Sequence, residues 1–306
     1  MNRRDLALAL LVVTVWGSSF TVIRIGLDSM PPMLLAALRF SLAAIPAVFF
    51  IRRPAIQLNY LLAYGATVGI GQFGCMFYAM HLGLPAGLAS VVLQSQAFFT
   101  LLLAALMLQE KVSGAQLAGL AMAATGLILI GSATGLAGTR AIPLSAMLLA
   151  ITGAAFWGVS NIVVRKAVNA GAGREQRLDM FSLVIWSSLV PPIPLLVLAF
   201  FLHTPEELSS AIQSFDLTAL LAVIYLAFAA TLFGFGTWSK LLSRYPASQV
   251  APLSLLVPVT GLLTANLVLG ERLVLLQWAG CILILCGLGT ASLRLRSLRR
   301  AVVGHI

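Results

Sequence analysis

Apolar stretches of about 20 residues follow one another along the whole chain, separated by short polar segments. A helix needs about 20 mostly apolar residues to cross the hydrocarbon core of a bilayer. The pattern predicts ten membrane-spanning helices, over residues 6–26, 33–51, 59–81, 86–109, 114–133, 143–164, 180–202, 217–241, 246–269 and 273–293. The expected fold class is therefore an all-α integral membrane protein, with loops too short to hold a soluble domain.

The two halves of the chain repeat one another at the level of single residues. One set of matches has an offset of 161 positions and pairs Pro85 with Pro246, Glu110 with Glu271, Gln116 with Gln277, Gly119 with Gly280 and Gly126 with Gly287. A second set has an offset of 141 and pairs Trp16 with Trp157, Gly17 with Gly158, Ser19 with Ser160 and Arg24 with Arg165. Such duplication is typical of transporters built from structural repeats. We assign residues 1–133 to a first repeat, 134–142 to a Gly-rich linker and 143–306 to a second repeat.

Each repeat holds five predicted helices, and this odd number means that the second repeat enters the membrane from the opposite side. All but four of the 19 lysine and arginine residues then fall on one side, the exceptions being Arg24, Arg39, Arg140 and Arg272. Loops rich in lysine and arginine face the cytoplasm. The repeats are therefore predicted to have inverted topology, with both termini in the cytoplasm.

Composition narrows the class of function. The chain is 60% hydrophobic and 9% charged, whereas soluble domains carry roughly 25% charged residues. The net charge of +10 follows the predicted topology, so we expect membrane lipid around the chain and no nucleic-acid partner.

The sequence gives little support for a catalytic, nucleotide-binding or metal-binding function. Cys75, Cys281 and Cys286 fall inside predicted spans without disulfide or metal spacing. No nucleotide-binding loop, metal motif or Ser/His/Asp set appears, and none of the nine carboxylates lies at mid-membrane. We therefore expect neither a metal, nor a cofactor, nor an enzyme.

Repeats of inverted topology place a substrate site near the bilayer midplane, where the halves meet. The residues expected at that depth are Trp16, Gln72, Gln94, Gln96 and Trp157. An unpaired amide is costly in hydrocarbon, so each glutamine faces protein or water. Gln94 and Gln96 point away from each other on a helix, so only one of them can line a narrow cavity. Bonds between helices are the alternative for the glutamines, and close helix packing is the alternative for the tryptophans.

Two prolines interrupt the ninth predicted helix. Pro252 and Pro258 remove hydrogen bonds that would end on the carbonyls of Ser248 and Ser254. We expect a hinge there, or carbonyls that bind a substrate ammonium, because the equivalent fourth helix has no proline at these positions. The alternative is an ordinary proline kink.

Arg39 is the one charge inside a predicted span. It can snorkel outward or pair with Asp28, which is the interpretation we favour, or it can meet a substrate carboxylate. The shared glycines of the fifth and tenth helices (Gly119, Gly126, Gly280 and Gly287) indicate close packing at an edge of the bundle or a homodimer contact, and the sequence leaves both open.

Several strings resemble the EamA family of the drug/metabolite transporter superfamily, namely ALLVVTVWGSSFTVIRIGL, ALRF, LPAGLASVVLQSQAFF, SLVIWSSLVPPIP and RYPASQVAPLSLLVPVTGL. The similarity covers essentially the whole chain. It implies ten helices in two inverted repeats, a place in the bacterial inner membrane, and export of cysteine-pathway metabolites such as O-acetylserine and cysteine. It also implies a cavity formed by helices 1, 3, 4, 6, 8 and 9, which adds Asn161 and Ser254 to the candidate binding residues.

Three other functions stay open. The first is a broad-specificity exporter of amino acids or drugs, and the second is an energy-independent facilitator, which the lack of a mid-membrane carboxylate favours. The third is a structural or assembly factor.

Overall fold

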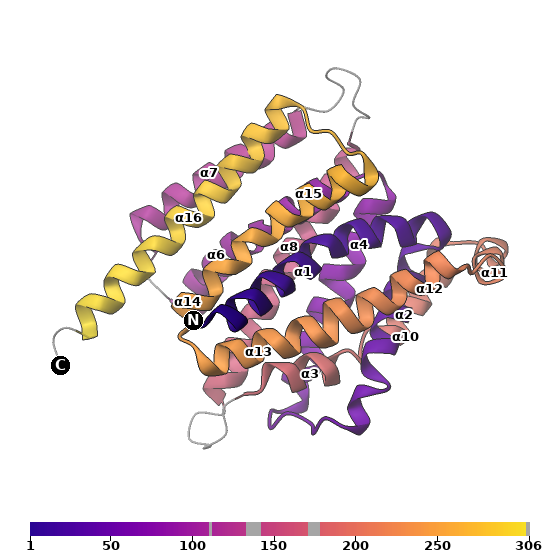
Figure 1. Ribbon diagram of the computed structural model, residues 1–306, viewed down its shortest axis with the longest axis horizontal. Helices are drawn as coiled ribbons and strands as arrows, with labels where there is room; N and C mark the ends of the chain where they lie inside the picture. Colours follow the sequence, from indigo (N-terminus) through magenta and orange to yellow (C-terminus); the bar gives the residue numbers. More distant parts are fainter. Residues whose placement is uncertain (110–111, 133–141, 171–177, 304–306) are drawn as a thin grey trace.

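The computed structural model describes residues 1–109, 112–132, 142–170 and 178–303, and the regular elements in these residues are helices (Figure 1). Those of the first half are α1 (Arg3–Ser29), α2 (Pro32–Ala44), η1 (Ala47–Phe49), α3 (Leu58–Gly65), η2 (Ala66–Gly74), α4 (Cys75–His81), α5 (Ala86–Val92), η3 (Leu93–Ser95), α6 (Gln96–Leu108) and α7 (Gly114–Ser132). Those of the second half are α8 (Leu144–Ala170), α9 (Met180–Ser187), α10 (Pro192–Leu202), α11 (Pro205–Gln213), α12 (Leu217–Ile224), η4 (Tyr225–Phe233), α13 (Gly234–Arg244), α14 (Ala247–Val250), η5 (Ala251–Leu256), α15 (Val257–Leu269) and α16 (Leu275–Val303).

Five helical stretches in the described residues are long and apolar enough to cross a membrane. They are Arg3–Ser29, Pro32–Phe49, Ala86–Leu108, Leu144–Ala170 and Leu217–Arg244. The pair α9 and α10, bent by 42°, would make a sixth. The arrangement of ten spans and the cytoplasmic termini stay predictions. Most of the predicted linker, 134–142, lies outside the described residues, so the domain boundary stays a prediction as well.

The duplication is visible in the bounds of the helices. α1 and α8 are both 27 residues long and begin 141 positions apart, at Arg3 and Leu144. α6 and α15 are both 13 residues long and begin 161 positions apart, at Gln96 and Val257. Both end on a left-handed residue, with a φ of 53° at Gln109 and 67° at Gly270. The two halves therefore share local geometry as well as residues.

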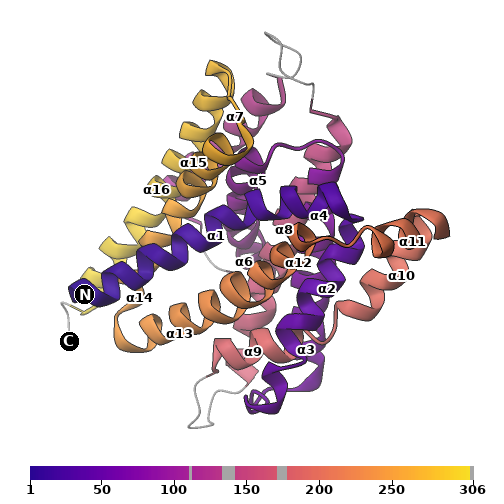
Figure 2. The same ribbon diagram turned by 45° about the vertical axis from the view of Figure 1, so that its right-hand side comes forward.

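α7 and α16 lie side by side at one edge of the molecule and run antiparallel (Figures 1 and 2). A Cβ atom on Gly126 would come 2.6 Å from the carbonyl oxygen of Gly280, and one on Gly287 would come 2.6 Å from that of Gly119. The offset of 161 converts each of these contacts into the other, as expected for two copies related by a pseudo-two-fold axis. These glycine surfaces pack against each other inside one chain, as expected for edge packing, and the homodimer stays a prediction.

A second exchange of contacts relates the interior helices. Gly17 of α1 packs on Val257, Thr260 and Gly261 of α15, whereas Gly158 of α8 packs on Phe99 and Thr100 of α6. Each contact joins the first helix of one repeat to the fourth predicted span of the other. Glycine permits this approach, because any larger side chain would collide with the facing backbone. The interior of the protein is thus the interface between the two repeats.

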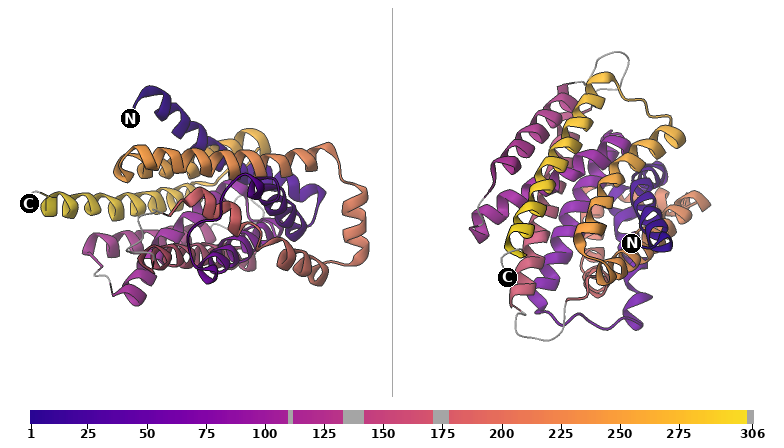
Figure 3. Two further views of the ribbon diagram at one scale, coloured as in Figure 1. Left: turned by 90° about the horizontal axis from the view of Figure 1, so that it is seen from below. Right: turned by 60° about the vertical axis from the view of Figure 1, so that its left-hand side comes forward.

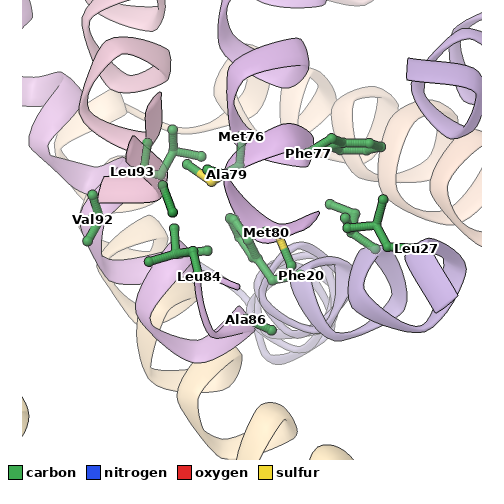
Figure 4. Packing of buried hydrophobic residues seen from close by; sticks show 14 of the residues in the cluster. Phe20, Leu27, Met76, Phe77, Ala79, Met80, Leu84, Ala86, Val92 and Leu93 are labelled. Atoms are coloured by element: carbon green, nitrogen blue, oxygen red, sulfur yellow. The ribbon is translucent and has the colours of Figure 1, made fainter. Parts of the chain in front are cut away.

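The core and the outer surface are both apolar. Phe20 of α1 and Met76, Phe77 and Met80 of α4 belong to the main buried cluster (Figure 4). Large apolar side chains also cover the outside, and Phe201 is 82% exposed. A soluble monomer rarely exposes wide apolar patches, so this surface is suited to lipid.

The segment 203–216, expected from the sequence to be a loop, contains the helix α11, which lies across one end of the bundle (Figure 3). The Thr204 side chain accepts a hydrogen bond from the Glu207 amide, and the Glu207 carboxylate accepts one from the Thr204 amide. This is a capping box, and its Thr-x-x-Glu pattern is readable in the sequence.

Replacing Gly280 with alanine is expected to lower the stability of the protein in detergent by about 1–3 kcal/mol, because the new methyl group meets the Gly126 backbone. Thermal unfolding followed by size-exclusion chromatography measures the effect.

Gly289→Ala is the matched control on the same helix, because nothing lies within 4 Å of its added Cβ. Alanine favours helix over glycine by roughly 0.5–1 kcal/mol, so the control should be neutral or stabilising. Equal effects of the two changes would contradict the proposed contact.

Candidate functional site

The interior helices lose regular α geometry at equivalent places in both repeats. Nine-residue π-helical stretches, η2 and η4, occupy the third and eighth predicted spans. The 3₁₀ segments η3 and η5 lie just before α6 and α15. Irregular helix at membrane depth is tolerated where protein or a cavity surrounds it, and π-helical segments occur often at functional sites. These four segments are therefore where a functional site is expected.

Trp16 packs between the repeats. Its indole Nε1 donates a hydrogen bond of 2.9 Å to the carbonyl oxygen of Ala230 in η4. Its ring lies 5.2 Å from the rings of Phe235 and Trp238 in α13. The half-buried indole thus ties α1 to the irregular part of the second repeat.

Next to Trp16, a tyrosine forms a second polar link with the same segment. Tyr225, the first residue of η4, donates to the carbonyl oxygen of Val15 at 3.0 Å, and its hydroxyl lies 2.7 Å from that of Ser18.

Gln96 and Asn161 are brought together across the repeat interface. The Asn161 amide nitrogen donates to the Gln96 Oε1 and to the Thr100 hydroxyl, both at 2.9 Å. The pair joins α6 of the first repeat to α8 of the second. Both side chains are half-buried, so this is a polar bond between helices that the protein does not fully enclose.

The other candidate residues are dispersed over the interior. Gln72 in η2 is buried, and its Oε1 has no hydrogen-bond partner. Gln94 in η3 is 9% exposed, and no hydrogen bond of its side-chain amide is seen among the described residues. Trp157 packs against the main apolar cluster, and Ser254 lies half-buried in η5. Whether these residues share one substrate site stays a prediction.

Pro252 and Pro258 of the predicted hinge lie at the junction of η5 and α15, and a hinge role stays a prediction. Pro258 is the second residue of α15, where a missing N–H is harmless, and it does not interrupt a helix. The Val257 amide donates to the Ser254 carbonyl, so that carbonyl is not left without a donor. The 3₁₀ segment η3 forms without any proline, so a proline is not required for a break of this kind. Pro252 is in η5, but its side chain lies outside the described residues.

The structure contradicts the favoured interpretation of Arg39, in which its side chain snorkels outward or pairs with Asp28. Its expected partner Asp28 pairs instead with Arg24, at 2.6 Å. Arg39 is 4% exposed and does not snorkel outward. A central arginine costs about 2.5–3.5 kcal/mol on insertion scales. The sequence had indicated that Arg39 is unusual, because it is a charged residue inside an apolar predicted span.

The seven candidate binding residues line neither of two cavities found in the described part of the chain. The larger, about 300 Å³, lies at the α15–α16 turn beside Glu271 and Trp278. The smaller, about 20 Å³, lies beside Arg39 between the two repeats.

Two helical units that meet through broken interior helices define a class of membrane transporters. The sequence profile of the EamA-like transporter family matches the chain twice, over residues 4–132 and 144–293. The chain belongs to the EamA-like transporter family and is a multi-pass protein of the bacterial inner membrane.

Two relatives resemble the chain over nearly its full length. It is 46% identical over 288 residues to a Salmonella typhimurium protein named probable amino-acid metabolite efflux pump, with 94% of each chain covered. It is 45% identical over 306 residues to an Escherichia coli K12 protein of the same name, covering 99% of this chain and 100% of that one. A solved crystal structure, 20% identical, superposes with a TM-score of 0.61 over 97% of this chain and 99% of that one, a likeness of fold alone.

The Gln96–Asn161 bond is expected to stabilise the repeat interface. In a double-mutant cycle of Gln96→Leu and Asn161→Leu, we expect a coupling free energy of about 0.6–1.7 kcal/mol in detergent unfolding, the range for hydrogen bonds between membrane helices.

The control cycle combines Gln96→Leu with Thr125→Val. Thr125 bonds only to its own helix, at the Ala121 carbonyl, so this pair should be additive. Additivity in the first cycle would mean that the two amides do not bond.

Proposed function

We propose that this chain exports small zwitterionic amino-acid metabolites from the cytoplasm by alternating access, with O-acetylserine and cysteine as substrates. The observation that carries the proposal is the full-length similarity to two relatives named probable amino-acid metabolite efflux pumps. The duplicated fold supports it, because repeats of this kind rock about a site at their interface. The family and the relatives' names indicate a transporter rather than an enzyme.

The proposed site lies where the repeats exchange contacts. Trp16 would form a wall of the site, with the amides of Gln72, Gln94, Gln96 and Asn161 as hydrogen-bond partners of the substrate. Trp157 and Ser254 would complete it, and the 3₁₀ segment with Pro252 and Pro258 would act as a hinge. Inter-repeat bonds such as Asn161 to Gln96 must break or rearrange when a substrate enters.

Polar contacts between the repeats close the bundle at both ends. At one end, the Tyr245 hydroxyl donates to the buried Asp5 carboxylate at 2.8 Å, and Arg244 lies 3.9 Å from the same carboxylate. At the other end, the Glu271 carboxylate accepts hydrogen bonds from the backbone amides of Ala86 and Gly87, at 2.7 and 2.9 Å. Figure 1 shows these two places at opposite ends of α1 and α15.

We propose that the two contacts open in turn during transport. Both contacts are formed in this structure, and each would close the bundle on its own side of the membrane. A carboxylate at the start of a helix, like that of Glu271 at α5, is favoured by the unpaired amides and the helix dipole.

A facilitator without energy coupling is the second candidate function. The acidic side chains in the described residues lie at helix ends or in turns, namely Asp5, Asp28, Asp179, Glu206, Glu207, Asp216 and Glu271. No carboxylate of this set is placed at mid-span to carry a proton. Flow down a substrate gradient that is unchanged by a pH gradient would favour a facilitator.

Purified protein in proteoliposomes is expected to take up labelled O-acetylserine and cysteine in a saturable manner. Gln94→Ala or Gln96→Ala should lower the initial rate at low substrate concentration by roughly tenfold, equivalent to about 1.4 kcal/mol.

Gln213→Ala, on the exposed surface of α11, is the matched control and should transport normally. Competition by lipophilic cations or aromatic amino acids as strong as that by O-acetylserine would support the broad-specificity exporter instead. Normal kinetics in both glutamine variants would remove them from the site.

Tyr245→Phe removes one hydrogen bond to Asp5 and keeps the ring. Amides at the start of α1 should then exchange with solvent about fivefold faster, which corresponds to a loss of about 1 kcal/mol. Hydrogen-exchange mass spectrometry measures this. Tyr60→Phe, whose hydroxyl makes no contact of this kind, is the control, and equal exchange in all three proteins would exclude a closing role for Tyr245.

A further inference from the structure

We infer that the Arg39 guanidinium is the anchor for the carboxylate of the transported molecule. This inference rests on the proposed function and names a residue outside the candidate site derived above. It starts from the unusual state of Arg39, which is a cation buried in α2 of a membrane protein.

The donors of Arg39 are almost unused. A guanidinium has five N–H donors. One of its terminal nitrogens donates to the Thr231 hydroxyl at a long distance of 3.4 Å, and Nε is buried without any partner. The ion pairs seen in the described residues are those of Arg24, His203 and Arg244, and none involves Arg39. Charges buried in proteins are normally paired, so the site lacks an anion.

Aromatic rings hold the guanidinium in place while its edge stays open. Its central carbon lies 3.9 Å from the centroid of the Phe73 ring and 5.2 Å from that of Phe40. Stacking of this kind covers the flat face of the group. The N–H groups point outward in the guanidinium plane, which is the geometry that binds a carboxylate in a bidentate manner.

Arg39 lies where the two π-helical stretches approach each other. Phe73 belongs to η2 of the first repeat and Thr231 to η4 of the second. The cavity of about 20 Å³ beside Arg39 has walls from both repeats, including Tyr64, Ser187 and Ser188. This volume holds about one water molecule, so a carboxylate can enter only when the repeats separate. Rocking of the halves would therefore open and close the anchor.

The positive charge and open donors of Arg39 favour an anion over a cation at this cavity. The hydroxyls of Ser188 and Thr231 donate to backbone carbonyls at 2.6 and 2.8 Å, and that of Ser187 does the same at 3.1 Å. Their hydrogens are thus committed, and Arg39 supplies the open donors among these groups. Its neighbour Phe235 also contacts Trp16, at 5.2 Å between ring centroids. A zwitterion with its carboxylate on Arg39 would extend along this ring toward the candidate site.

The test compares each transported amino acid with its methyl ester, which lacks the negative charge, as competitors of uptake in proteoliposomes. The wild-type protein should prefer the amino acid by at least tenfold. In Arg39→Gln this preference should fall to about one because the amino acid binds more weakly, while inhibition by the ester is unchanged. Arg53→Gln, at an exposed arginine, is the matched control and should keep the preference. A folded Arg39→Gln variant with the wild-type preference would overturn the inference.

A second measurement does not depend on changing Arg39. In a variant with the three native cysteines replaced, Ser187→Cys places a thiol in the wall of the cavity beside Arg39. The amino acid should slow the reaction of this thiol with a maleimide at least threefold, and the methyl ester should not. Equal labelling rates with and without the amino acid would overturn the anchor.

The two proposals fail in different ways. If carboxylates protect Ser187→Cys but no amino-acid metabolite is transported, the anion site stands and the proposed function is wrong. If transport is intact and the preference for the carboxylate does not depend on Arg39, the function stands and the anchor is wrong.

Discussion

A backbone amide or carbonyl inside a bilayer has no water to bond with, and this constraint governs the rest of the structure. It makes the chain helical, because a helix satisfies its backbone within one segment. It also disfavours irregular geometry where a helix faces only lipid. The π-helical stretches and the 3₁₀ segments lie on the predicted spans that meet other helices in the interior. The outermost helices, α7 and α16, are free of such breaks.

Glycine determines how closely the two repeats approach each other. Helices in lipid gain little from the hydrophobic effect on association, so they depend on close packing and on polar bonds between them. Close packing at the edge comes from the pairs Gly126–Gly280 and Gly119–Gly287. Polar bonds between helices in the interior run from Tyr225 to Val15 and from Asn161 to Gln96. The edge is closely packed through glycine, whereas polar bonds join the repeats across a largely apolar interior, and alternating access would require these bonds to rearrange.

The repeats share a scaffold but differ in chemistry at its centre. At the equivalent positions of α6 and α15, the first repeat has Gln96 and the second Val257. Asn161 of α8 corresponds to Phe20 of α1 at the offset of 141. Symmetric helices thus hold an asymmetric set of polar groups, which is what binding an asymmetric molecule such as an amino acid needs.

The sequence alone determined the helical class, the duplication and the polar residues of the interior, because apolar length and residue matches are local properties of the chain. The sequence did not predict helix α11, whose capping box is seen in the structure. It failed for Arg39, since the nearest acid along the chain, Asp28, is held by Arg24. Only the tertiary structure showed that Arg39 lies between the π-helical stretches, because its neighbours Phe73 and Thr231 come from opposite repeats. It likewise decided which glycine meets which, since contacts between distant segments depend on how the repeats fold onto each other.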